Sequence, residues 1–146
     1  MTDTPSPARI VVGVDGSALA TNALEFAIEE ARLRKAELHV TYAYPVMASR
    51  VTGSTGKDYY EQVEAEAKEF LQGIMATAPS TEGLKVEWLG VPGNPSEVLI
   101  EASRGATLLV VGSRGQGGFI GLMMGSVSTQ CVHYSHCPVL VVREGH

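Results

Sequence analysis

The glycines are the residues of this chain whose spacing indicates chemistry most clearly, because half of them gather in two short segments. Of the 16 glycines, six lie between Gly112 and Gly125, and two more, Gly13 and Gly16, lie near the N-terminus. A glycine backbone can turn its N–H groups toward a ligand without a Cβ in the way, and successive N–H groups of this kind bind anions. The two segments together therefore predict a site for a phosphate-bearing ligand.

The second segment supplies the candidate phosphate-binding residues. Ser126 is predicted to begin a helix, whose first N–H groups and positive dipole favour a phosphate, and the hydroxyl groups of Ser126 and Ser128 add donors. Arg114 is the only formally charged side chain in the range 105–142, so no carboxylate of this stretch would repel a phosphate. The candidates are Gly112, Ser113, Arg114, Gly115, Gln116, Gly117, Gly118, Gly125, Ser126 and Ser128.

The first segment offers a carboxylate. Gly13, Val14 and Asp15 follow an apolar run, and Asp15 can accept hydrogen bonds from a sugar hydroxyl, whereas it would repel a phosphate. We therefore expect base and ribose near the first segment and phosphates on the second. No lysine stands in a P-loop context, and Gly13 and Gly16 lack the spacing of a dinucleotide-binding fingerprint. The alternative is a pair of glycine turns that bind no ligand.

Regular elements must position these two segments. Short apolar runs alternate with stretches of helical periodicity, and the expected strands are 9–14, 38–43, 84–91, 107–111 and 138–142. This alternation predicts an α/β fold with one doubly wound, open, parallel sheet and helices on both faces. The first and fourth strands are the most apolar, so we expect them to be central and to flank the point where the strand order reverses. Ligands bind beyond the C-terminal ends of strands at such a point.

Local signals predict where the helices begin and end. Ser17 is a predicted N-cap for the first helix, and Asn94 followed by Pro95 predicts the start of the third. An apolar stripe predicts the second helix within residues 57–79, and a fourth is expected over residues 126–135.

Composition and charge exclude several classes of protein. The chain has 146 residues, 45% of them hydrophobic, and a net charge of -5, which predicts one folded domain and argues against a general binder of nucleic acid or anionic membrane. No apolar stretch approaches the ~20 residues of a membrane helix, and residues 1–9 lack a secretory apolar run. We expect a cytoplasmic protein with a flexible N-terminal segment, residues 1–8, and one domain, residues 9–146.

Three stretches resemble one known family. The spacing Gly112-x2-Gly115-x9-Gly125-Ser126 resembles the ATP-binding signature of the universal stress protein family. Residues 12–17 are similar to the opening strand and loop of that family, and residues 135–142 are similar to its last strand. The resemblance covers essentially the whole chain.

The resemblance implies a five-stranded sheet of order 3-2-1-4-5 and a homodimer formed through the last strand, residues 137–143. It also implies the ATP-binding branch of the family, with ATP bound alone or with Mg²⁺, and a role as a nucleotide-dependent sensor or regulator in the stress response. Asp15 would contact ribose or adenine, and Ala43 would offer backbone groups to adenine. The resemblance assigns the triphosphate to Gly112, Arg114, Gly115, Gln116 and Gly118, closed over by Gly125, Ser126 and Val127.

The candidate site holds little that would make an enzyme. Phosphoryl transfer needs a positioned base and usually carboxylates that hold Mg²⁺, and Asp15 is the only acid in the predicted site. His39 falls inside a strand, where a packed or edge histidine is expected. We therefore expect no catalytic residue and no protein ligands to a metal. The alternatives are a slow ATPase or autophosphorylating protein, a cyclic-AMP-binding protein, and a ligand-free interaction module that uses the apolar residues within 119–124.

Overall fold

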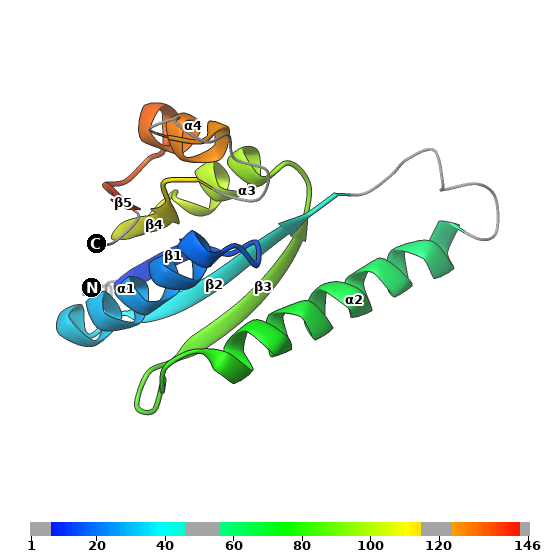
Figure 1. Cartoon of the computed structure of the whole chain (residues 1–146), viewed down its shortest axis with the longest axis horizontal. Coiled ribbons are helices and arrows are strands. Elements are labelled where there is room, and N and C mark those ends of the chain that lie inside the picture. The colour runs from blue at the N-terminus through cyan, green and yellow to red at the C-terminus, as the bar shows by residue number, and fades with distance from the viewer. Residues whose placement is uncertain (1–6, 46–55, 115–123, 144–146) are drawn as a thin grey trace, which may run out of the picture.

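A single parallel sheet organises the chain. The computed structural model describes residues 7–45, 56–114 and 124–143 (Figure 1). Its elements in chain order are β1 (Arg9–Gly13), α1 (Ala18–Arg34), β2 (Glu37–Tyr44), α2 (Gly56–Thr77), β3 (Val86–Pro92), α3 (Pro95–Ala102), β4 (Leu108–Gly112), α4 (Ser126–Tyr134) and β5 (Val139–Val142). Residues 1–6 of the predicted N-terminal segment, and the apolar residues at 119–123, lie outside the described ranges.

The sheet has five strands in the order β3-β2-β1-β4-β5, and every neighbouring pair is parallel. This confirms both the doubly wound α/β fold and the strand order. The order reverses between β1 and β4, which lie side by side with Val12 opposite Val110. The two most apolar strands therefore flank the reversal point, and the loops that follow them leave the same edge of the sheet.

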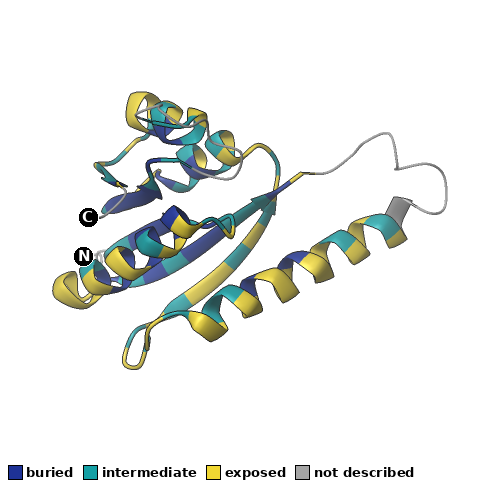
Figure 2. Ribbon diagram, viewed as in Figure 1, coloured by how far each residue is buried: buried dark blue, intermediate teal, exposed yellow. Residues whose placement is uncertain are grey.

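Each face of the sheet has its own core, which explains the unbroken apolar runs of the central strands. Along β1, Ile10 and Val12 pack on one face with residues of α1 and α2, and Val11 packs on the other with residues of α3 and α4. All three side chains are essentially fully buried. Figure 2 shows this burial concentrated in the central strands and in the stripes of the helices that face them. Helices cover both faces, as predicted.

The predicted starts of α1 and α3 are confirmed, and both helices have their expected caps. The Ser17 hydroxyl accepts the N–H of Ala20 at 3.2 Å at the start of α1. At the start of α3, the Asn94 side chain accepts the N–H groups of Ser96 at 3.0 Å and of Glu97 at 3.3 Å, with proline in the first turn. Both caps satisfy N–H groups that have no partner within their own helix.

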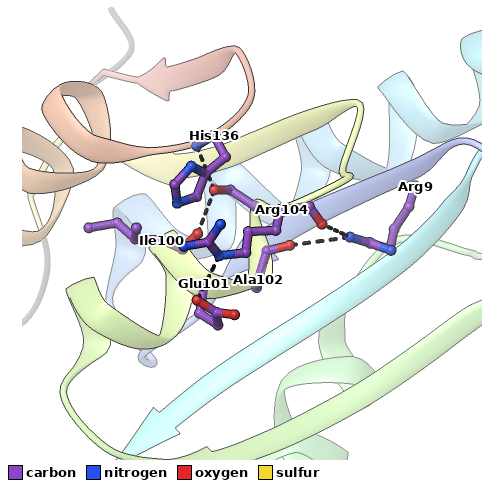
Figure 3. Close-up of polar contacts among 7 residues, drawn as sticks. Arg9, Ile100, Glu101, Ala102, Arg104 and His136 are labelled. Atoms are coloured by element: carbon purple, nitrogen blue, oxygen red, sulfur yellow. Dashed lines mark hydrogen bonds and ion pairs between the residues drawn. The ribbon is translucent and has the colours of Figure 1, made fainter.

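Hydrogen bonds of Ser103 and Arg9 connect the end of α3 to two distant segments at the N-terminal ends of the strands (Figure 3). Ser103 is fully buried; its hydroxyl donates to the carbonyl of Ile100 at 2.6 Å and accepts the N–H of His136 at 2.8 Å. The guanidinium of Arg9 donates to the carbonyl of Arg104 at 2.6 Å. These bonds connect the end of α3 to the start of β1 and to the turn before β5, so they fix the N-terminal ends of these strands relative to one another.

The third strand differs from its expected bounds. It begins at Val86, not at residue 84, because Leu84 donates its N–H to Thr81 in a turn before the strand. β3 is an edge strand of the sheet, and its Trp88 side chain stays half exposed. The described helices include none that is long and apolar enough to cross a membrane.

The two cysteines are expected to differ in reactivity. Cys131 lies on the buried face of α4, and burial, helped by the nearby Cys137 thiol, raises the pKa of the Cys131 thiol to about 11. At pH 8 about 0.1% of such a thiol is thiolate, which is the reactive form. Cys137 is partly exposed. We expect one thiol per chain to react with an aromatic disulfide reagent in the folded protein and two after unfolding in guanidinium. Rapid reaction of both thiols in the folded protein would contradict the buried position of Cys131.

Candidate functional site

The candidate site lies at the C-terminal ends of β1 and β4. Because these strands are neighbours and parallel, the segments after Gly13 and Gly112 leave the sheet side by side. The structure thus brings together the described members of both predicted segments. Gly115, Gln116, Gly117 and Gly118 lie outside the described residues.

The first loop is a tight turn held at both ends. Val14 is buried and donates its N–H to the carbonyl of Thr41 on β2 at 2.9 Å. Asp15 accepts the N–H of Ser17 through Oδ1 at 2.9 Å, and Gly16 has a φ of 85°, a conformation that suits glycine. These contacts place the Asp15 carboxylate, which is partly buried, between the end of β1 and the first turn of α1.

The second loop has a narrow neck, which we define as Ser113, Gly125 and Ser128. The carbonyl of Ser113 accepts the N–H of Gly125 at 2.6 Å and the hydroxyl of Ser128 at 2.8 Å. The N–H of Ser113 donates to the carbonyl of Val142 on β5 at 2.8 Å. Ser113 and Ser128 are both buried. The chain therefore leaves β4 and returns to begin α4 at nearly the same point.

The Ser128 hydroxyl has a different position from the one expected of a phosphate donor. It is 2% exposed and donates to the carbonyls of Ser113 and Gly125, which occupies its only hydrogen. In the described structure Ser128 therefore holds the neck closed. The sequence did not indicate this role, because the bond joins residues 15 positions apart.

The N-terminus of α4 carries N–H groups that have no partner within the helix. The first backbone hydrogen bond of this helix runs from the N–H of Thr129 to the carbonyl of Gly125 at 3.0 Å. The backbone N–H groups of Ser126, Val127 and Ser128 come before it and have no partner within the helix. Gly125 is the N-cap and has no side chain to satisfy them, whereas Ser17 and Asn94 cap α1 and α3. Ser126 is exposed and Val127 is partly buried. Such an end is suited to an anion.

Two glycines of the site are also required by packing. A Cβ on Gly112 would lie 3.0 Å from the backbone carbon and the Cβ of Leu19 in the first turn of α1. A Cβ on Gly13 would lie 2.6 Å from Cδ1 of Leu99 in α3. Both glycines let a helix approach the end of a strand closely, independently of any ligand.

The end of β2 completes the base of the first loop. Ala43 is partly buried and pairs with Val91 of β3, and the carbonyl of the next residue, Tyr44, accepts the N–H of Gly93 at 2.9 Å. Burial raises the pKa of the Tyr44 phenol, and the negative charge of Glu64 raises it further, so the phenol stays neutral at physiological pH. Ala43 thus lies next to the predicted adenine end.

Sequence reasoning missed Thr41. It lies opposite Gly13 in the β1–β2 register and is 2% exposed, and its hydroxyl oxygen has no hydrogen-bond partner in the described structure. A buried polar atom without a partner is uncommon and often marks a functional position. The only signal in the sequence is a threonine in the middle of a predicted strand.

The site as a whole presents donors more than acceptors. Backbone N–H groups of α4 stand near the end of β4, Arg114 follows directly, and Asp15 is the only carboxylate among residues 9–17, 112–114 and 124–128. This set of groups suits an anion that also carries hydroxyl donors. Within those ranges it provides no carboxylate pair of the kind that phosphoryl-transfer enzymes use to hold Mg²⁺.

Comparison with known proteins assigns the family. The model of the universal stress protein family matches residues 8–143, so the chain belongs to the universal stress protein family. A universal stress protein of Bacillus subtilis, YxiE, is 34% identical, with 92% of this chain and 98% of that protein covered. The universal stress protein Mb2028c of Mycobacterium bovis is 33% identical over 96% of this chain but only 47% of its own length. The chain thus spans about half of that relative, and both relatives are named without an enzymatic activity.

Solved structures show the same fold. Universal stress protein UspA from Lactobacillus plantarum aligns with a TM-score of 0.74 at 22% identity, over 96% of this chain and all of that one. A universal stress protein in complex with cAMP aligns with a TM-score of 0.63 at 27% identity, covering 95% and 98% of the two chains. A universal stress protein from Archaeoglobus fulgidus in complex with dAMP aligns with a TM-score of 0.55 at 26% identity, covering 92% and 97%.

The packing at Gly112 can be tested without any ligand. We expect Gly112→Ala to lower the free energy of unfolding by about 1–3 kcal/mol, because the new methyl group would press on the backbone of Leu19. Gly73→Ala is the matched control: Gly73 lies in α2, and a Cβ added there would meet nothing within 4 Å, so the change should stabilise by up to about 1 kcal/mol. Urea denaturation measures the free energy of unfolding of both variants. Equal stability of the two would show that the packing around Gly112 tolerates a Cβ.

Proposed function

We propose that this protein binds an adenine nucleotide, ATP in the first place, and acts as a nucleotide-dependent sensor or regulator and not primarily as a catalyst. The observation that carries the proposal is the neck formed by Ser113, Gly125 and Ser128, which places the N-terminus of α4 beside the end of β4. The phosphates would bind the N–H groups of Ser126 and Val127 there, with Arg114 and residues 115–118 around them.

The position of Asp15 supports a nucleoside at the other end of the site. Its loop follows β1, which is the strand next to β4, so a ligand that spans the two loops places its sugar near this carboxylate and its phosphates away from it. Ala43 and the unpartnered hydroxyl of Thr41 lie on β2, on the side of β1 away from β4, where the base would bind. Mg²⁺ would accompany the phosphates of ATP and keep water ligands, as Mg²⁺ commonly does.

The family supports an adenine nucleotide in particular. One structural relative was solved with cAMP and another with dAMP, and both share more than a quarter of their residues with this chain. The cAMP complex makes cyclic AMP the second candidate ligand. We favour ATP because the glycine segment from Gly112 to Gly125, with Arg114 and the end of α4, offers more donors than the single phosphate of a cyclic nucleotide needs.

Calorimetric titration of nucleotide-free protein with MgATP tests the proposal. We expect binding of one ATP per chain, and Asp15→Ala should weaken it by about 10- to 100-fold, since a hydrogen bond to a charged group is worth about 1.5–3 kcal/mol. The same variant should bind inorganic triphosphate as the wild type does. Gly125→Val should abolish binding of both, because its side chain would stand at the N-terminus of α4, and Gly73→Ala should change neither.

Three results would contradict this assignment. The first is the absence of binding at millimolar ATP, and the second is an equal loss of ATP and triphosphate binding in Asp15→Ala. The third is competition in which cyclic AMP displaces ATP at lower concentration than ATP displaces cyclic AMP, which would assign the site to the cyclic nucleotide.

We further propose that two copies pair through β5. It lies at the edge of the sheet, and the carbonyls of Pro138 and Val142 point to β4 because they accept N–H groups from Leu109 at 3.0 Å and Ser113 at 2.8 Å. Successive residues of a strand direct their backbone N–H and C=O groups to opposite sides, so those of Val139 and Val141 point away from β4. On that outer side of β5 they are available to a second chain.

Val141→Pro tests this pairing. Proline removes an outward N–H and is tolerated at a sheet edge, so the variant should keep its circular dichroism spectrum and elute as a monomer. Val141→Thr, which keeps the N–H group, should elute as the wild type does. Light scattering after size-exclusion chromatography gives the masses, and a wild-type monomer, or a Val141→Pro dimer, would rule out pairing through this edge.

A further inference from the structure

A cluster of three ligand-type side chains lies away from the nucleotide site, on β2 and β3. Glu37 and His39 are two residues apart on β2, so they point to the same face of the sheet, and Glu87 of β3 lies directly opposite His39 in the register. Their ligand atoms all lie within 4.8 Å of one another. Glu37 and His39 are each 16% exposed and Glu87 is 46% exposed, so solvent reaches the cluster from the side of β3.

The imidazole of His39 is directed into this cluster without a hydrogen bond. Its Nε2 is buried and has no hydrogen-bond partner in the described structure. Nε2 lies 3.5 Å from Oε2 of Glu87 and 3.7 Å from Oε1 of Glu37. Both separations exceed the ~2.7–3.2 Å of a hydrogen bond. Burial of a polar atom without a partner is costly, so the position calls for a group that satisfies Nε2 and the two carboxylates together.

The spacing of these atoms matches the ligand shell of a metal ion. Ligands at about 2.0–2.2 Å from a tetrahedral ion lie roughly 3.3–3.6 Å from one another, which is close to the two separations that His39 makes. Two carboxylates and a neutral imidazole carry a charge that a divalent cation neutralises. The mixture of one nitrogen and two oxygens favours Zn²⁺ over Mg²⁺ or Ca²⁺, which prefer oxygen ligands alone.

We propose that Glu37, His39 and Glu87 bind one divalent transition-metal ion, Zn²⁺ in the first place, with solvent as the fourth ligand. Lys85 lies 3.4 Å from Glu37, but its side chain is 68% exposed, and an exposed pair of this kind contributes little to stability, so the ammonium can move aside. The ion joins the edge strand β3 to β2. Ligand binding to the folded state alone stabilises it, so Zn²⁺ raises the melting temperature.

The site is independent of the proposed nucleotide function. His39 lies four residues before Ala43 on β2, which is about 13 Å along a strand, and the nucleotide loops leave the opposite end. The sequence predicted no metal ligands because Glu87 and His39 are 48 positions apart, so no local motif contains both.

The test uses nucleotide-free, full-length protein titrated with Zn²⁺ by calorimetry. We expect one ion per chain in the wild type, and at least a tenfold weaker affinity in both His39→Gln and Glu87→Gln. The controls are His133→Gln and Glu25→Gln, which remove an exposed imidazole and an exposed carboxylate elsewhere and should bind as the wild type does. Glu87 is half exposed, so Glu87→Gln should fold even if His39→Gln does not.

Thermal unfolding and Co²⁺ absorption give two further readouts. Zn²⁺ should raise the melting temperature of the wild type and of both controls, and should raise it little in Glu87→Gln. Co²⁺ should give the strong visible absorption of a tetrahedral site in the wild type and lose it in Glu87→Gln. The proposal is overturned if the wild type binds no Zn²⁺ at 100 µM, or if Glu87→Gln and His39→Gln bind it as tightly as the controls do.

Discussion

The predicted nucleotide site depends on the two hydrogen bonds that the backbone carbonyl of Ser113 accepts. This carbonyl accepts the N–H of Gly125 at 2.6 Å and the hydroxyl of Ser128 at 2.8 Å, in a position where both serines are buried. Breaking these bonds would leave polar groups unsatisfied away from water, which is costly. The bonds among Ser113, Gly125 and Ser128 therefore hold the end of β4 next to the start of α4. The first N–H groups of α4, which have no partner within the helix, owe their place beside β4 to this neck.

The glycines around the neck show that one residue type can serve two demands at once. Gly13 and Gly112 allow α3 and α1 to approach the ends of β1 and β4 to within van der Waals contact. The same close approach brings helix ends and strand ends together at the edge where the loops emerge. A high glycine content at a strand end is thus a packing requirement of this fold as well as a feature of anion sites.

The sheet separates two kinds of chemistry along the same strand. The C-terminal end of β2 lies next to the first loop and contributes the backbone groups of Ala43 and the neutral phenol of Tyr44. Its N-terminal half contributes Glu37 and His39, which face Glu87 across the strand pair. Because a strand is rigid and its side chains alternate, occupation of one end need not disturb the other.

The sequence by itself determined the elements, the two glycine segments and the helix caps of Ser17 and Asn94, because these depend on local patterning and on neighbours a few residues apart. The strand order followed from the resemblance to the family, and the structure confirms it. Only the tertiary structure decided that the Ser128 hydroxyl closes the neck, that Thr41 has an unpartnered hydroxyl, and that Glu87 faces His39. Each of these depends on which distant backbone or strand lies alongside, and hydrogen-bond partners and cross-strand register exist only once the long-range contacts have formed.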